Sequence, residues 1–281
     1  MTRALTRHAA FLCLFAAVLA TSSVTAQDSR SANSSLKLVT GPHYPPYAAD
    51  YLPHKGLGPF LATRILGNTA RSLTVDMRPW KRAYREALEG QYDAVLPYVA
   101  TPGRQEDYLF SVPIFETRAF AYVMKDSELD AHSLEGLRGL TYCNPIGFTD
   151  GNELEKMRLD GFITRFTPAS LESCFNMLRA GRVDFVKTNE LVADHVIAAS
   201  DLSADEIRSL PFVVEEAALH LMVPRARPGA EALIDEFNER FRTMKDSGRI
   251  DALRKSYLES IDLGAGPHRI GPSAAGTTSD G

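Results

Sequence analysis

The sequence predicts an α/β fold. Short apolar segments alternate along the chain with segments in which apolar residues recur at i, i+3, i+4 and i+7, the spacing of one helix face. Such alternation implies mainly parallel sheets covered by helices on both faces. Between a leader and a polar tail, about 235 residues remain, enough for one large domain or two small ones.

The first 26 residues have the features of a signal peptide. Arg3 and Arg7 precede an apolar run of 12 residues (9–20), and Val24-Thr25-Ala26 fits the small-x-small rule for cleavage after Ala26. The run is shorter than the roughly 20 residues that span a bilayer. Cys13 follows Leu12 rather than a small residue, so we expect no lipid anchor. The mature protein is therefore expected in the periplasm.

The charge of the mature chain argues against nucleic acid as a partner. Cleavage removes Arg3 and Arg7 from 31 basic residues, which leaves 29 against 35 acidic ones and a formal net charge of −6. Proteins that bind nucleic acid usually carry a basic footprint.

Eight strands and four helices can be assigned along the mature chain. The strands are expected at 36–40, 73–77, 92–98, 118–124, 140–143, 162–167, 183–188 and 219–223. The helices are expected at 80–88, 171–178, 230–246 and 249–258.

Two further patterns concern the organisation of the chain. Residues 88–95 (LEGQYDAV) resemble residues 179–186 (RAGRVDFV), each a helix that ends at a glycine before a strand. Any α/β protein repeats such joints, but two similar lobes also fit the length. Residues 264–281 are rich in Gly, Pro, Ser and Thr and are expected to form a disordered tail.

Two cysteines, Cys143 and Cys174, remain after cleavage. In an oxidising compartment they either form a disulfide or stay as two buried thiols. A bridge across this interval would contribute about 3–4 kcal/mol in the chain-entropy model.

Four side chains are expected at one rim of the fold. Tyr47 follows the first strand and the rigid Pro45-Pro46 pair, Trp80 opens a helix, and Tyr98 and Arg104 follow the strand 92–98. In open α/β sheets, ligands lie beyond the carboxyl ends of the strands. A guanidinium among aromatic faces suits a carboxylate ligand. The alternative for Arg104 is a local ion pair with Glu106 or Asp107.

The order of several motifs resembles the extracytoplasmic solute-binding proteins of the polar amino acid uptake family. The resemblance spans residues 36–262 and is carried by PPY (45–47), WKRA (80–83), GQYD (90–93), TPGR (101–104), FSVP (110–113), GRVD (181–184), FN (237–238) and SG (247–248).

The resemblance implies two α/β lobes joined by two hinge strands that close over a small solute. Lobe one would comprise residues 36–120 and 218–262, and lobe two residues 121–217. The expected function is delivery of a small polar or carboxylate-bearing solute, in the first place an amino acid, to an ABC-type permease. We also expect a monomer without cofactor or metal.

The resemblance assigns roles to individual residues. Arg104 would clamp a carboxylate, and Tyr47 and Trp80 would enclose the rest of the solute. Lobe two would contribute Gly147, Phe148 and Thr149 from the loop NPIGFTDGNE (144–153). For Thr149, and for the neighbouring Asp150, a helix cap is the alternative.

The chain departs from the family pattern at two places. Pro97-Tyr98 replace the small hydroxyl residues that usually help to bind the carboxylate. Asn189 stands where an aspartate usually receives the ammonium group of the solute, although Glu190 is adjacent. A carboxylate without an α-amino group, or another small polar metabolite, is therefore a second possibility. The family also favours a Cys143–Cys174 bridge as a clamp on lobe two.

Enzymatic motifs are absent from the sequence: there is no G-x-S-x-G, H-E-x-x-H or P-loop pattern. Glu215 and Glu216 are adjacent on a strand, so they should point to opposite faces. Some relatives are dehydratases of cyclic carboxylates, and Glu190 is then the candidate acid or base. A binding protein that serves a membrane sensor is a further alternative.

Overall fold

The computed structural model describes residues 35–67 and 72–261. The predicted signal peptide and the predicted tail at 264–281 lie outside the described residues. No helix in the described ranges is long and apolar enough to cross a membrane.

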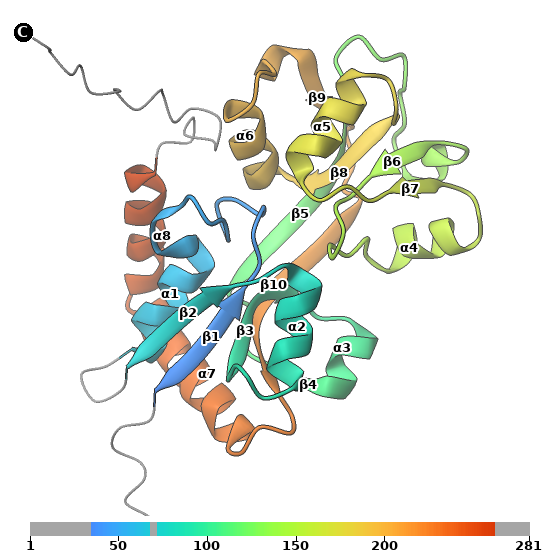
Figure 1. Cartoon of the computed structure of the whole chain (residues 1–281). Helices are drawn as coiled ribbons and strands as arrows, with labels where there is room; N and C mark the ends of the chain where they lie inside the picture. The colour runs from blue at the N-terminus through green and yellow to red at the C-terminus, as the bar shows by residue number, and fades with distance from the viewer. Residues whose placement is uncertain (1–34, 68–71, 262–281) are drawn as a thin grey trace, which may run out of the picture.

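The described chain folds into two lobes joined by two long strands, β5 and β10 (Figure 1). Lobe one contains β1 (Leu36–Thr40), α1 (Leu57–Leu66), β2 (Leu73–Met77), α2 (Trp80–Leu88), β3 (Ala94–Val99), α3 (Pro102–Asp107), β4 (Tyr108–Phe110), α7 (Ala230–Asp246) and α8 (Arg249–Ser260). Lobe two contains β6 (Thr141–Cys143), α4 (Asn152–Leu159), β7 (Thr164–Phe166), α5 (Leu171–Arg179), β8 (Phe185–Asn189), α6 (Glu190–Ala198) and β9 (Ile207–Ser209). The connecting strands are β5 (Phe115–Met124) and β10 (Glu215–Pro224).

The strands form one hydrogen-bonded path in the order β2-β1-β3-β10-β5-β8-β6-β7. Within each lobe three strands are parallel: β1 pairs with β2 and β3, and β6 pairs with β7 and β8. The short strands β4 and β9 lie off this path and pair antiparallel with β10 and β5. The connecting strands are antiparallel to β3, to β8 and to each other. The predicted α/β class is therefore confirmed, with antiparallel strands where the lobes join.

Every expected strand and helix is present, but the connecting strands are longer than expected. Expected at 118–124 and 219–223, they begin at Phe115 and Glu215, because the first five residues of β5 and of β10 pair with each other before β5 reaches β8 and β10 reaches β3. The unpredicted helix α1 buries eight of its ten residues, including Leu57, Leu61 and Leu66. A helix that is apolar on all sides has no polar face, and a periodicity search therefore does not find it.

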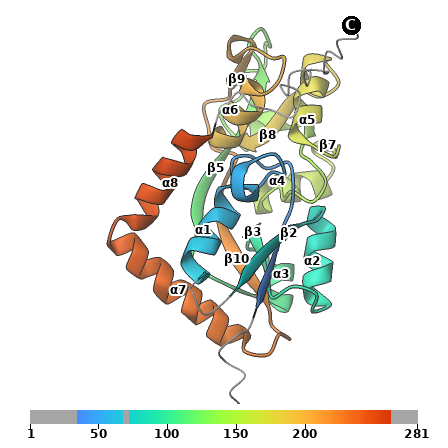
Figure 2. The same ribbon diagram turned by 60° about the vertical axis from the view of Figure 1, so that its left-hand side comes forward.

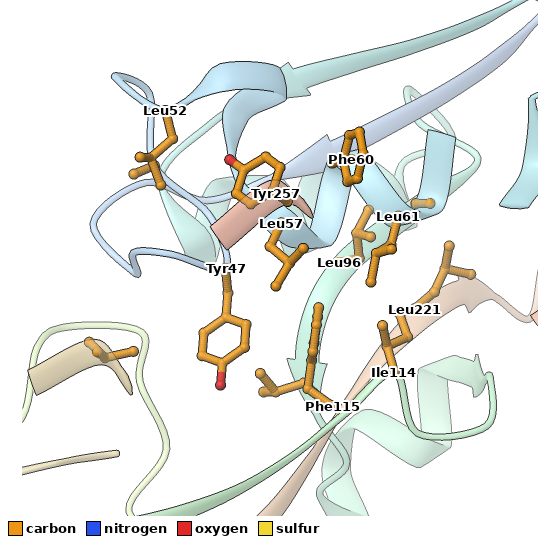
Figure 3. Close-up of a cluster of buried hydrophobic side chains, with 14 of the residues drawn as sticks. Tyr47, Leu52, Leu57, Phe60, Leu61, Leu96, Ile114, Phe115, Leu221 and Tyr257 are labelled. Atoms are coloured by element: carbon orange, nitrogen blue, oxygen red, sulfur yellow. The ribbon is translucent and has the colours of Figure 1, made fainter. Parts of the chain in front are cut away.

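The core of lobe one lies between its sheet and a layer formed by α1, α7 and α8. Helices α7 and α8 lie along the outer side of α1 (Figure 2). Buried side chains from α1, β3, β5, β10 and α8 meet in this core, and the ring of Tyr47 lies beside Phe115 at its edge, with ring centroids 4.8 Å apart (Figure 3). This packing fixes the carboxyl ends of the lobe-one strands at one edge of the lobe.

A disulfide joins the sheet of lobe two to a helix. Cys143 ends β6, Cys174 lies in α5, both are fully buried, and their Cα atoms are 5.4 Å apart. Of the two alternatives, a disulfide or two buried thiols, the structure thus contains the disulfide. It clamps α5 onto the strand that leads into the loop 144–151.

Replacing both Cys143 and Cys174 with alanine is expected to lower the free energy of unfolding by about 3–4 kcal/mol, because the bridge restricts the unfolded chain. Urea denaturation monitored by circular dichroism measures this change. The wild type in reductant serves as the control and should lose a similar amount. Equal stability of the oxidised wild type and the double variant would contradict the expectation.

Candidate ligand-binding site

A cavity lies between the two lobes, beyond the carboxyl ends of β3 and β8. Its volume is about 70 Å³, small beside the roughly 300–1,000 Å³ of pockets for drug-sized ligands. Polar and aromatic side chains from both lobes and from the connecting strands line it: Tyr44, Trp80, Tyr98, Arg104, Thr117, Asn144, Phe148, Thr149, Lys187, Thr188, Asn189 and Glu215, with Gly147. Such a cavity suits a small polar solute.

Arg104 is held at the wall of this cavity by local structure. The hydroxyl of Thr101 caps α3 and accepts a hydrogen bond from the Arg104 amide at 3.3 Å. One guanidinium N–H donates to the Val99 carbonyl at 2.7 Å, and the guanidinium carbon lies 4.8 Å from the centre of the Tyr98 ring. Stacking and one backbone hydrogen bond therefore aim the guanidinium.

Arg104 makes no ion pair with an acid in the described ranges. Asp107 instead accepts a hydrogen bond from the Tyr84 hydroxyl at 2.7 Å. The alternative of a local pair with Glu106 or Asp107 is therefore not what the structure contains. Burial lowers the pKa of Arg104 below its ordinary value, because desolvation disfavours the charged form. Arginine nonetheless stays protonated in proteins. A buried cation without an acid partner is unfavourable, so an anionic ligand would stabilise it.

Three aromatic rings from both lobes meet at one side of the cavity. Trp80 donates its indole N–H to the Pro42 carbonyl at 2.8 Å. Tyr44 packs edge-on against Trp80 and Phe148, with centroid distances of 6.3 and 5.1 Å, and Trp80 and Phe148 are also 6.3 Å apart. Phe148 belongs to lobe two and the other two rings to lobe one, so this cluster closes the cleft.

Gly147 brings the loop of lobe two close to Trp80. Its φ is +89°, and a Cβ atom at this position would lie 3.0 Å from the Trp80 Cβ. Glycine is therefore required here both for the backbone conformation and for the close approach of the lobes.

Gly147→Ala is expected to weaken solute binding at least about fivefold, since overpacking a close contact costs about 1 kcal/mol or more. Gly139→Ala is the matched control: its φ is +82°, but nothing lies within 4 Å of the added Cβ. Both variants should lose stability, and only Gly147→Ala should lose affinity in calorimetry. Equal affinities of the two variants would exclude a role for this contact in closure.

The loop before α4 is held by a buried ion pair rather than by a helix cap. Helix α4 begins after Gly151, and no side chain caps it, contrary to the alternative considered for Thr149 and Asp150. Asp150 instead accepts hydrogen bonds from Arg165 and Asn144, each at 2.6 Å. The carbonyl of Thr149 points to the cavity side and accepts from Lys187 at 2.8 Å. The loop is thus a rigid part of the site.

Asn189 is in the cavity, and both ends of its side-chain amide make hydrogen bonds within the protein. Its side-chain oxygen caps α6 by accepting from the Val192 amide at 3.1 Å, and its amide group donates to the Tyr44 hydroxyl at 2.8 Å. Burial, with smaller effects of Tyr47 and Glu215, raises the pKa of Tyr44 well above its ordinary value. Asn189 therefore links the lobes and presents no negative charge.

Two predicted site residues lie outside the cavity. Tyr47 is 5% exposed and packs on Phe115, while Tyr44 occupies the place beside Trp80. Glu190 is exposed and lies 3.5 Å from Arg118. Tyr47 and Glu190 instead line a neighbouring outer depression beside β5 and β10, which shares Thr117 and Asn189 with the cavity. The PPY motif favoured Tyr47, and only the fold of the loop decides which tyrosine faces the cleft.

A family model described as bacterial extracellular solute-binding proteins, family 3, matches residues 36–260. The chain belongs to this family. No curated protein matches the sequence. Among the described residues, no group of three or more His, Cys, Asp or Glu side chains is placed to hold a metal ion.

Solved structures of the same fold share little sequence with this family 3 chain. A mutant of ArgBP from T. maritima is 22% identical, with a TM-score of 0.67 over 80% of this chain and 95% of that one. A histidine kinase sensor domain is 17% identical, with a TM-score of 0.68 over 80% and 96%. The ancestral amino acid-binding protein AncCDT-1, a precursor of cyclohexadienyl dehydratase, is 19% identical, with a TM-score of 0.64 over 79% and 95%. At these identities the likeness shows the fold alone.

Two charged residues of this family 3 site, Lys187 and Glu215, were not among the predicted site residues. Lys187 on β8 and Glu215 on β10 form an ion pair, and their side chains are only 7% and 11% exposed. A lysine in the apolar strand segment VDFVKT was the available signal. Glu215 faces the cavity and Glu216 the outer depression, as strand geometry requires.

Proposed function

We propose that this family 3 protein is a periplasmic solute-binding protein that delivers a small solute with an anionic group to an ABC-type permease. The observation that carries the proposal is Arg104: a desolvated guanidinium that lines the cavity between two lobes and has no acid partner in the described ranges. A ligand carboxylate would supply the missing charge through paired hydrogen bonds.

Closure of the lobes is the proposed working motion. The chain would pass from lobe one to lobe two near residue 120 in β5 and return near 217 in β10. Contacts such as Asn189 to Tyr44 and Phe148 to Trp80 join the lobes in the shut form. A solute that binds Arg104 and lobe two together would favour this form, since a ligand shifts an equilibrium by its differential affinity. The permease would recognise the shut monomer, exported after cleavage at Ala26.

Isothermal titration calorimetry tests the proposal. The mature protein is titrated with a panel of small monocarboxylates of two to six carbons, their α-amino acid counterparts, and uncharged amides of the same size. Heat from acids but not from the amides is expected. A folded sample that binds no acid of either kind would overturn the proposal of an anionic solute.

The dehydratase alternative loses its candidate residue. Glu190 was to act as acid or base, but it lies outside the cavity beside Arg118. The acid that lines the cavity is Glu215, and its carboxylate is engaged by Lys187. We therefore propose binding rather than catalysis. If the protein served a membrane sensor instead of a permease, the sensor would recognise the same shut form.

A further inference from the structure

The negative charge of the cavity is already neutralised by the protein. Glu215 is the one acid among the described residues that line the cavity. Lys187 donates to its carboxylate and, at 2.8 Å, to the Thr149 carbonyl. Gly151 leaves room for the Glu215 carboxylate, because a Cβ there would lie 2.8 Å from the Glu215 carboxyl carbon. One carboxylate oxygen of Glu215 and the Thr149 carbonyl, two acceptors that could receive a ligand ammonium, are thus both engaged by Lys187.

Asn189 does not take the place of a free carboxylate as an acceptor for a ligand ammonium. Its oxygen is used by the Val192 amide, and its NH₂ group donates to Tyr44. The side chain therefore contributes neither charge nor a free acceptor pair equal to that of a carboxylate, whose two oxygens accept about four hydrogen bonds.

The aromatic rings are not arranged as a cage for a cation either. A cation needs an open ring face within about 6 Å of the ring centre. Tyr44, Trp80 and Phe148 make edge-to-face contacts with one another at centroid distances of 5.1 to 6.3 Å. In the shut form these three rings therefore pack on one another rather than around a ligand cation.

The charges that line the cavity leave an excess of one positive charge. Arg104 and Lys187 are cationic and Glu215 is anionic. A monoanion balances this set. A zwitterionic amino acid would add an ammonium beside Lys187, and burying a charge without a partner is strongly unfavourable.

We propose that the cavity selects a small monocarboxylate without an ammonium group, and that the Lys187–Glu215 pair is the specificity element that excludes α-amino acids. This inference rests on the proposed function, since it presumes that Arg104 holds the carboxylate of the solute.

Matched ligand pairs test the inference. Calorimetry compares propanoate with L-alanine, 3-methylbutanoate with L-valine, and 4-methylpentanoate with L-leucine. We expect the wild type to bind the amine-free member of a pair at least about tenfold more tightly, equivalent to about 1.4 kcal/mol. Equal or tighter binding of the amino acids would overturn this inference and leave the anionic solute intact. No binding of either member would count against the proposed function itself.

Lys187→Met is the decisive variant. It frees the Glu215 carboxylate and makes the cavity charge zero, the charge of a zwitterion. The preference for the amine-free acid should fall at least about tenfold, whereas a merely structural role of Lys187 would weaken both ligands alike. An unchanged preference would overturn the inference.

The double variant Lys187→Met with Glu215→Gln is the control for a loss of folding in the single variant. It removes the pair without burying an unpaired charge, and Arg104 again leaves an excess of one positive charge. Its preference should return to within about threefold of the wild type. A preference that stays at the value of Lys187→Met would show that charge balance is not the cause, which would contradict the proposal.

Discussion

Arg104→Met is expected to abolish most of the binding of the tightest acid in the calorimetric panel. Loss of one partner of a desolvated charge pair costs about 2–5 kcal/mol, or about 30- to several thousand-fold in affinity. Methionine retains an apolar stem beside Tyr98, so packing changes little. The free energy of unfolding should stay the same or rise, because the ligand-free protein no longer buries a cation without an acid partner.

Arg118→Met is the control for this variant. Arg118 is exposed, lies outside the cavity and pairs with Glu190 at 3.5 Å. An exposed pair contributes about 0–1 kcal/mol, so neither affinity nor stability should change by more than this. If Arg104→Met bound the acid as tightly as Arg118→Met does, the role of Arg104 as the carboxylate clamp would be refuted.

Arg165→Met is expected to lower the free energy of unfolding by about 3–5 kcal/mol, because it leaves the buried carboxylate of Asp150 unpaired. The Asp150 side chain is fully buried, and Arg165 also donates to the carbonyls of Asn144, Pro145 and Phe148 at 2.8 to 3.1 Å. Urea denaturation measures the loss. Solute affinity should fall as well, since the loop that carries Phe148 is no longer tied down.

Two further variants serve as controls for the stability of Arg165→Met. Arg85→Met removes an exposed pair with Glu89 and should cost about 0.5 kcal/mol or less. Adding Asp150→Asn to Arg165→Met removes the buried charge and should recover part of the stability. A single Arg165→Met variant as stable as Arg85→Met would show that the buried pair contributes nothing to the loop.

Much of the fold could be predicted from local patterns. The strands and the helices α2, α5, α7 and α8 follow from apolar periodicity, and α2 and α7 were expected with their actual bounds. Helix α1 could not be found in this way, because nearly all of its residues are buried. The full length of β5 and β10 was also missed, since the pairing of their first residues with each other joins segments far apart in the sequence.

The candidate site was only partly predictable. Trp80, Tyr98, Arg104, Phe148 and Asn189 meet at one cavity from segments that motifs had singled out. Lys187 and Glu215, although far apart in the sequence, are adjacent in the cavity. No motif marks such a pair, because the apolar neighbours of Lys187 indicate a buried lysine but not which acid it meets in the fold.

The sequence by itself determined the family, the α/β class, the cysteine pair and the presence of Arg104 after its Thr-Pro-Gly turn. Only the tertiary structure decided which tyrosine faces the cleft and how the charges balance there. The physical reason is that segment patterns depend on neighbours along the chain, whereas desolvation and ion pairing depend on groups that folding brings together from distant segments.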